Sequence, residues 1–183
     1  MHATYKQMTD FLVGLGIDKI PHSAKSYLAH LISVYRIMKE NGCEEDVCRA
    51  GLFHSVYGTE KFQGFTLPLE RRGEVSDLIG ARAERLAYLN CAMDRAPFDQ
   101  LVEAGREPYV FRDRITGQEF ELSLGDFDDL CRVHLFDWLE QVPRSRYGWS
   151  YRREAYRRMA ERVGGAALEA YGQVFAQEPA PAS

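Results

Sequence analysis

Apolar residues recur at intervals of three and four along most of the chain, the spacing that places them on one face of an α-helix. This pattern predicts helices over residues 3–15, 24–41, 44–57, 72–79, 81–93 and 124–142, and one or two more over residues 151–176. Gly or Pro residues stand at several of the predicted ends, where they stop a helix. The sequence therefore predicts an all-α protein.

One segment departs from the helical spacing. In residues 108–123, PYVFRD and QEFELS alternate polar and apolar positions around the turn-like run from Arg114 to Gly117, which predicts a β-hairpin. Residues 61–71 predict an irregular loop. With no internal repeat, the expected organisation is one helical domain over residues 1–176, with the hairpin inserted at 107–123 and a disordered tail at 177–183.

The centre of this domain is expected at Tyr27–Glu60, which predicts two helices joined by a turn at Asn41-Gly42. Ser23 is the expected N-cap of the first helix. The second half of the second helix is apolar almost all round, which is typical of a helix inside a core, and Gly58 ends it.

Composition and charge narrow the classes of function. A net charge of −4 argues against a protein that binds nucleic acid across a broad face, and no apolar stretch reaches the length of a membrane span. The first ten residues do not have the pattern of a signal peptide. The four cysteines lack zinc-site spacing, so we expect buried free thiols and a cytoplasmic protein.

Histidine is scarce, with 5 in 183 residues, yet the two central helices each offer one, His30 and His54. Neutral imidazoles brought together where two helices cross can bind Mn, Fe or Zn. Two core histidines satisfied by hydrogen bonds are the alternative that spacing alone leaves open.

The same stretch resembles the HD superfamily, and is most similar to the stringent-response hydrolases of guanosine tetraphosphate. Those enzymes show a pattern similar to Tyr-x-x-His-x-x-x-Val-x-x-Ile-Leu, followed by Ala-Ala-Leu-Leu-His-Asp. The positions that match here are Tyr27, His30, Val34, Ile37-Met38, Ala50, Leu52, Phe53 and His54. The resemblance implies an HD-like helical fold and a divalent metal held by His30 and His54.

The motif departs from that family at Ser55, which stands where HD enzymes have a metal-binding Asp. A neutral hydroxyl is a weak ligand, so a site for two ions is not expected. By resemblance to the later Asp of HD domains, the third ligand is expected to be Asp137, with Asp94 as the competitor. Two histidines and one carboxylate leave coordination positions open for water or substrate.

Other residues near the motif are candidates for direct roles in the reaction. Ser55, Tyr57 and Glu60 are candidate catalytic groups, Glu60 as a base, and His22, Ser26 and Arg95 are candidate substrate-binding groups. His134, alone on an apolar stripe, is expected to be a core residue. The arginines between Arg144 and Arg162 predict a solvated helical face or a dimer contact.

Three functions remain open at this point. The first is a metal-dependent hydrolase of a phosphorylated small molecule or nucleotide. The second is an iron-dependent oxygenase, since some HD relatives are oxygenases, and the third is a non-catalytic binding module in which Ser55 marks a lost metal site. The hairpin at 107–123 fits either a cover over the pocket or a contact within a homodimer.

Overall fold

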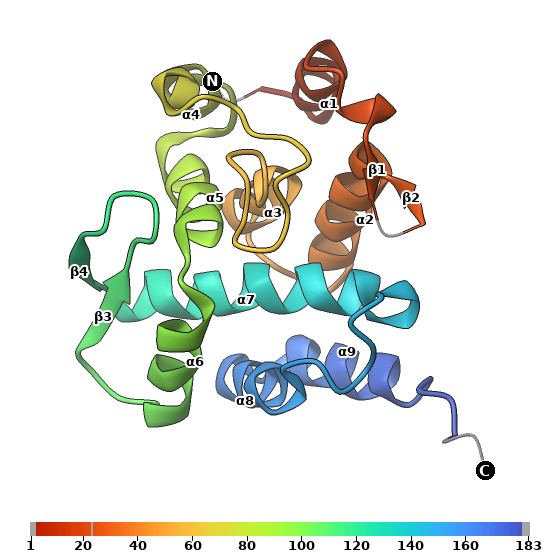
Figure 1. Cartoon of the computed structure of the whole chain (residues 1–183), viewed down its shortest axis with the longest axis vertical. Helices are drawn as coiled ribbons and strands as arrows, with labels where there is room; N and C mark the ends of the chain where they lie inside the picture. The colour runs from red at the N-terminus through yellow and green to blue at the C-terminus, as the bar shows by residue number, and fades with distance from the viewer. Residues whose placement is uncertain (1–2, 23, 181–183) are drawn as a thin grey trace.

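Helix α7 (Leu124–Gln141) crosses the middle of the computed structural model, which describes residues 3–22 and 24–180 (Figure 1). Helices α1 to α5 lie on one side of it, and α6, α8 and α9 lie on the other (Figure 1). Their bounds are α1 (Tyr5–Gly14), α2 (Tyr27–Glu40), α3 (Glu45–Phe53), α4 (Arg72–Ile79), α5 (Ala81–Ala92), α6 (Arg95–Ala104), α8 (Arg153–Val163) and α9 (Gly165–Phe175). The mainly helical fold expected from the apolar spacing is confirmed. No helix within the described ranges has the length and apolarity that crossing a bilayer requires.

The expected hairpin forms from β3 (Tyr109–Arg112) and β4 (Glu119–Leu122), which pair antiparallel with Tyr109 opposite Leu122. Burial alternates along β3, because Tyr109 and Phe111 are buried whereas Arg112 and the apolar Val110 are exposed. The Tyr109 ring stacks on Phe127 of α7 with 4.1 Å between ring centroids. The hairpin is therefore fixed to one end of α7, far from the end that bears Gln141 (Figure 1).

The start of α2 differs from the prediction. A second, very short hairpin of β1 (Pro21–His22) and β2 (Lys25–Ser26) precedes the helix, and Ala24 has a left-handed φ of 67° in its turn. This conformation cannot begin a helix, so α2 starts at Tyr27 with Ser26 as its N-cap. The predicted cap, Ser23, lies outside the described residues.

Helix α6 was not predicted, because it follows the predicted end of the helix at 81–93 and contains Pro97, a residue that stops a helix when it lies in the interior. Pro97 instead occupies the first turn of α6, where a helix has no intrahelical partner for the missing N–H. Helix α3 is also shorter than expected, ending at Phe53 so that His54 is its C-cap.

The core lies where α2, α3, α5 and α7 pack together, and Gly51 of α3 lies against α2 there. A Cβ atom at Gly51 would lie 2.4 Å from Met38 Sδ of α2 and 3.4 Å from Val34 Cγ1. A side chain at this position would overlap Met38 Sδ. The glycine therefore lets α3 lie close to α2. The four cysteines are free thiols, and all but the half-buried Cys43 are buried.

Candidate metal centre

Three elements bring His30, His54 and Asp137 together in the core. His30 projects from the first half of α2, His54 follows the last residue of α3, and Asp137 lies near the end of α7. One ligand atom from each lies within 4.8 Å of the others, and all three residues are buried. The predicted set, with Asp137 as its carboxylate, is therefore assembled by the fold.

The distances within this cluster suit one metal ion. His30 Nε2 lies 3.3 Å from His54 Nε2 and 3.1 Å from Asp137 Oδ1, and His54 Nε2 lies 3.2 Å from the same oxygen. Ligands at ~2.1 Å from one ion are separated by about 3.0 Å at octahedral angles and about 3.4 Å at tetrahedral angles. All three observed separations fall between those two values.

Hydrogen bonds on the far side of each ring determine which nitrogens hold protons. His54 Nδ1 lies 2.7 Å from the Gly51 carbonyl oxygen, which can only accept, so this nitrogen donates. His30 Nδ1 lies 2.5 Å from Glu140 Oε2 and donates to that carboxylate. In neutral rings both Nε2 atoms therefore present lone pairs to each other and to Asp137. Metal-binding histidines have this arrangement, with a carboxylate or carbonyl orienting the ring.

Glu140 remains ionised although it is 6% exposed, because cations surround it. Burial raises the pKa of this carboxyl, but hydrogen bonds from His30, Lys25 and Arg144 outweigh it and hold the pKa below its ordinary value. Lys25 Nζ lies 2.5 Å from Oε1, and Arg144 binds Oε2. An anionic Glu140 is the form that accepts a proton from His30.

The cluster also shifts the pKa of its own members. Burial favours the neutral form of Asp137, but His54 and His30 together hold its pKa well below the ordinary value. Burial lowers the pKa of His30, yet the bonds to Asp137 and Glu140 outweigh it and raise the pKa. The raised pKa favours a second proton on His30, and on Nε2 that proton faces His54 Nε2 and Asp137 Oδ1 when no metal is bound.

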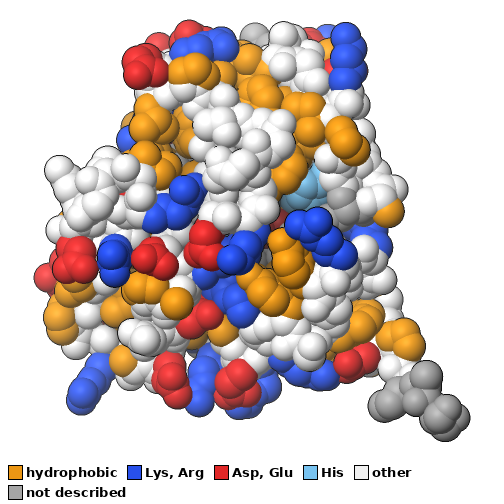
Figure 2. Space-filling view, viewed as in Figure 1, with side chains coloured by type: hydrophobic (Ala, Val, Ile, Leu, Met, Phe, Trp, Pro, Cys, Tyr) orange, Lys and Arg blue, Asp and Glu red, His pale blue; other side chains and the backbone are white. Residues whose placement is uncertain are grey.

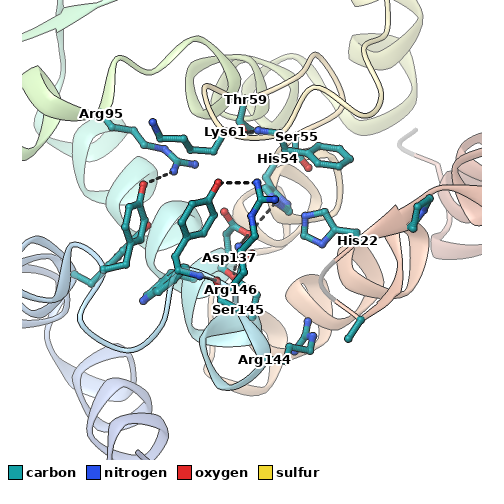
Figure 3. A pocket seen from close by; sticks show the side chains of 18 residues that line it. His22, His54, Ser55, Thr59, Lys61, Arg95, Asp137, Arg144, Ser145 and Arg146 are labelled. Atoms are coloured by element: carbon teal, nitrogen blue, oxygen red, sulfur yellow. Dashed lines mark hydrogen bonds and ion pairs between the residues drawn. The ribbon is translucent and has the colours of Figure 1, made fainter.

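A cavity of about 390 Å³ lies directly over this cluster, with His54 and Asp137 in its lining. Four basic side chains also line it, Lys61 from the segment after α3, Arg95 from α6, and Arg144 and Arg146 from the segment after α7 (Figure 3). Histidine surface is visible beside Lys and Arg side chains on the face shown in Figure 2. Arg144 pairs with Glu140 and Lys61 with Glu60, whereas Arg95 and Arg146 donate to tyrosine hydroxyls. Asp137 is the one acidic residue in the lining that the structure describes, so the cavity favours an anionic ligand, chiefly through Arg95 and Arg146.

Two further predicted residues lie in this cavity. Ser55 lines it, and its hydroxyl lies 2.8 Å from the buried Tyr27 hydroxyl. His22 lines it too and stacks on His30, with 4.4 Å between ring centroids. Burial and the neighbouring His30 lower the pKa of His22 to about 4, so its ring is neutral at physiological pH.

Four other candidates lie elsewhere. The Tyr57 hydroxyl donates to the buried Glu84 at 2.9 Å and does not line the cavity, so the structure does not support the catalytic role predicted for it. The same holds for Glu60, which pairs with Lys61 and accepts from the Arg95 backbone N–H. Ser26 caps α2 outside the cavity. Asp94 is the N-cap residue of α6, outside the cluster, which leaves Asp137 as the carboxylate.

Sequence reasoning identified Arg95 as a substrate-binding candidate, but not Glu140 or the other three basic residues of the lining. Glu140 lies three residues after Asp137 on α7, the spacing that places two side chains on one helix face, and this signal was available in the sequence. Lys61 and Arg146 come from irregular segments whose course no periodic pattern predicts. His134 is buried in the core, as expected.

Comparison with known proteins gives one match. Residues 11–95 match the model of a domain of unknown function (DUF6817). The matched range contains His30 and His54 but not Asp137. Neither the curated proteins nor the solved structures include a match to this chain.

Proposed function

We propose that this protein is an HD-like, metal-dependent hydrolase of a phosphorylated small molecule or nucleotide. One observation carries the proposal: three facing acceptor atoms of His30, His54 and Asp137 lie beneath a cavity with four basic side chains. The acceptors suit a divalent cation such as Mn, Fe or Zn, and the basic side chains suit the phosphate of a substrate.

The residues of the chain have separate roles in this proposal. His30, His54 and Asp137 hold the ion, and Glu140 and the Gly51 carbonyl orient the two rings. A divalent ion supplies a Lewis acid for the phosphoryl oxygen and lowers the pKa of bound water.

The walls of the cavity bind the substrate. Arg95 reaches it from α6, with Nη1 donating to the Tyr151 hydroxyl at 2.9 Å (Figure 3). Its remaining guanidinium N–H groups suit a phosphate, because a guanidinium donates two parallel hydrogen bonds to phosphate oxygens. Arg146 comes from the segment between α7 and α8, where its Nη2 donates to the Tyr147 hydroxyl at 3.2 Å. Ser55, held by Tyr27, offers a neutral hydroxyl where a second ion would need a carboxylate, so we propose a site for one ion.

An iron-dependent oxygenase is the second candidate, because two histidines and one carboxylate with open positions are the donor set of many non-haem Fe(II) oxygenases. We prefer the hydrolase because basic side chains line the cavity, and oxygen activation does not require them.

One experiment separates these activities. Metal-free protein is loaded in turn with Mn²⁺, Zn²⁺ and, without oxygen, Fe²⁺, and is then given a panel of nucleotides and sugar phosphates. The hydrolase predicts release of inorganic phosphate in a metal-dependent manner with no uptake of O₂. Consumption of O₂ by the Fe²⁺ protein without phosphate release would favour the oxygenase. A protein that binds no metal would be a binding module, and the proposal would be wrong.

A further inference from the structure

A chain of buried hydrogen bonds links His54 to the start of α8. Asn90 Nδ2 donates to the His54 carbonyl oxygen at 2.7 Å, and Asn90 Oδ1 lies 3.1 Å from His134 Nδ1. Arg152 Nη1 donates to His134 Nε2 at 2.8 Å. Four segments of the fold, the end of α3, α5, α7 and the residue before α8, therefore meet in one line of polar contacts.

Each donor in this series of hydrogen bonds points toward His54. The His54 carbonyl can only accept, which turns the Asn90 amide so that its oxygen faces His134. His134 Nδ1 must then donate, which leaves Nε2 as the acceptor for Arg152. Burial and the adjacent Arg152 lower the pKa of His134 well below its ordinary value and keep the ring neutral. Bonds aligned in this way strengthen one another in a buried setting.

Arg152, at the outer end of this series of hydrogen bonds, has a strained backbone. Arg152 has a left-handed backbone with φ of 46°, an unfavourable conformation for a residue with a side chain. Asp99 of α6 fixes its guanidinium, with Nε donating to Oδ2 at 2.8 Å. Arg152 also ends the segment that brings Tyr147 and Tyr151 into the cavity wall.

We infer that Asn90, His134 and Arg152 are positioning residues that set how tightly the candidate metal centre binds its ion. His54 is beyond the last residue of α3, so the helix ladder alone does not fix it. The Asn90 amide holds its carbonyl while Gly51 holds its ring, and together these bonds aim Nε2 at His30 and Asp137. This inference rests on the proposed metal site.

Metal affinity tests the inference, measured by titration of metal-free protein with Zn²⁺ against a chelating competitor. Direct hydrogen-bond partners of metal-binding histidines alter affinity by about 10–100-fold, and because His134 acts through Asn90 we expect the lower end of that range, about tenfold, for His134→Leu. His134→Gln offers one acceptor to Arg152 and one donor to Asn90, so its affinity should stay within about threefold of the original.

Tyr88→Phe is the matched control, because it also removes a buried hydrogen bond of α5, the 2.7 Å bond to Asp113, which is not part of the chain from His54. It should leave Zn²⁺ affinity unchanged. With Co²⁺ bound, the visible absorption spectrum should change in His134→Leu and not in Tyr88→Phe, since that spectrum reports ligand geometry.

The outcomes separate the two proposals. If the original protein binds Zn²⁺ and His134→Leu binds it equally well, the positioning role is wrong and the metal site stands. If the original protein binds no metal, both are wrong. Should His134→Leu fail to fold, Arg152→Met tests the same chain from its outer end, where a weakening in the same direction is expected and an unchanged affinity overturns the inference.

Discussion

His30 Nε2 lies 3.3 Å from His54 Nε2, and the opposite nitrogen of each ring already donates its proton to a separate acceptor. Two neutral imidazoles in this state present lone pairs to each other beside the Asp137 carboxylate. Such an arrangement is repulsive unless a metal ion lies among the three atoms or His30 holds a second proton. The relationship between these two nitrogens is therefore the structural basis for a metal centre.

The carboxylate of the site can be tested by exchange for an amide. Asp137→Asn removes the one charged ligand and should weaken Zn²⁺ binding by at least about 100-fold, more than the loss of an outer partner would. Asp94→Asn is the control, since Asp94 is the N-cap residue of α6 and 3.6 Å from Arg112. Equal affinities for the two variants, measured by chelator competition, would contradict the assignment of Asp137.

Glu140→Gln tests the orientation of His30. The amide is neutral and no longer matches Lys25 and Arg144, so the bond to His30 Nδ1 weakens and Zn²⁺ affinity should fall by about 10–100-fold. The exposed carboxylate of Glu74, which pairs with Arg71, provides the control variant Glu74→Gln. A loss of affinity in both variants would point to a general effect of charge instead.

Arg95→Gln tests the anion-binding wall of the cavity. With metal bound, inorganic phosphate should bind about tenfold more weakly to this variant, the size expected for losing one charged hydrogen bond. Arg158→Gln on α8 removes an arginine that pairs with Glu154 and Glu103 outside the cavity, so phosphate binding should not change. Calorimetric titration measures the phosphate affinity of both variants. An unaltered affinity in Arg95→Gln would show that Arg95 does not bind the anion.

The stability of the protein should fall in mild acid because of His134. Its pKa is depressed in the folded state, so the unfolded chain binds a proton that the folded chain excludes. Above the ordinary pKa of 6.5 neither state binds this proton, so the buried neutral ring does not lower the free energy of unfolding. As pH falls below 6.5 the unfolded chain takes up the proton, and the free energy of unfolding falls. Between pH 7.5 and 5.5 this group should account for about 1.4 kcal/mol of the free energy of unfolding.

Urea unfolding at both pH values, compared between the original protein and His134→Gln, isolates that contribution. The original protein should lose more stability on acidification than the variant does. An equal loss in both would show that His134 is not the titrating group.

Gly51→Ala should disturb the crossing of α2 and α3. The added Cβ would overlap Met38 Sδ, and overpacking a core of this kind costs about 1–3 kcal/mol. Gly73→Ala is the opposite case, because Gly73 lies in α4 with nothing within 4 Å of an added Cβ. It should stabilise the protein by roughly 0.5–1 kcal/mol in thermal or urea unfolding. A Gly51 variant as stable as the Gly73 variant would contradict the packing argument.

Much of the fold follows from patterns that are local in the sequence. The long apolar repeat of α7 and the glycines at 80 and 164 predict helix type and limits, because these depend on a few neighbouring residues. The exceptions have local causes too. Pro97 is tolerated within the first turn of α6, so a helix forms where none was predicted. Ala24 reverses the chain ahead of α2, so this helix starts later than its apolar spacing predicts.

The candidate site was predictable only in part. His30 and His54 stand out by their scarcity and spacing, and Asp137 by its cost on an apolar helix. Glu60 was placed in the site by closeness in sequence, yet the chain turns after Gly58 and directs its carboxylate to Arg95. Contacts such as Asn90 with the His54 carbonyl depend on how distant helices pack, which residue types alone do not specify.

Metal content tests the central claim most directly. Protein prepared without added chelator is analysed for Mn, Fe and Zn by elemental mass spectrometry, beside a His54→Ala variant prepared in the same way. We expect close to one ion per chain in the original protein and a small fraction of that in the variant. A substoichiometric content in the original protein, or the same content in both, would contradict the proposed metal centre.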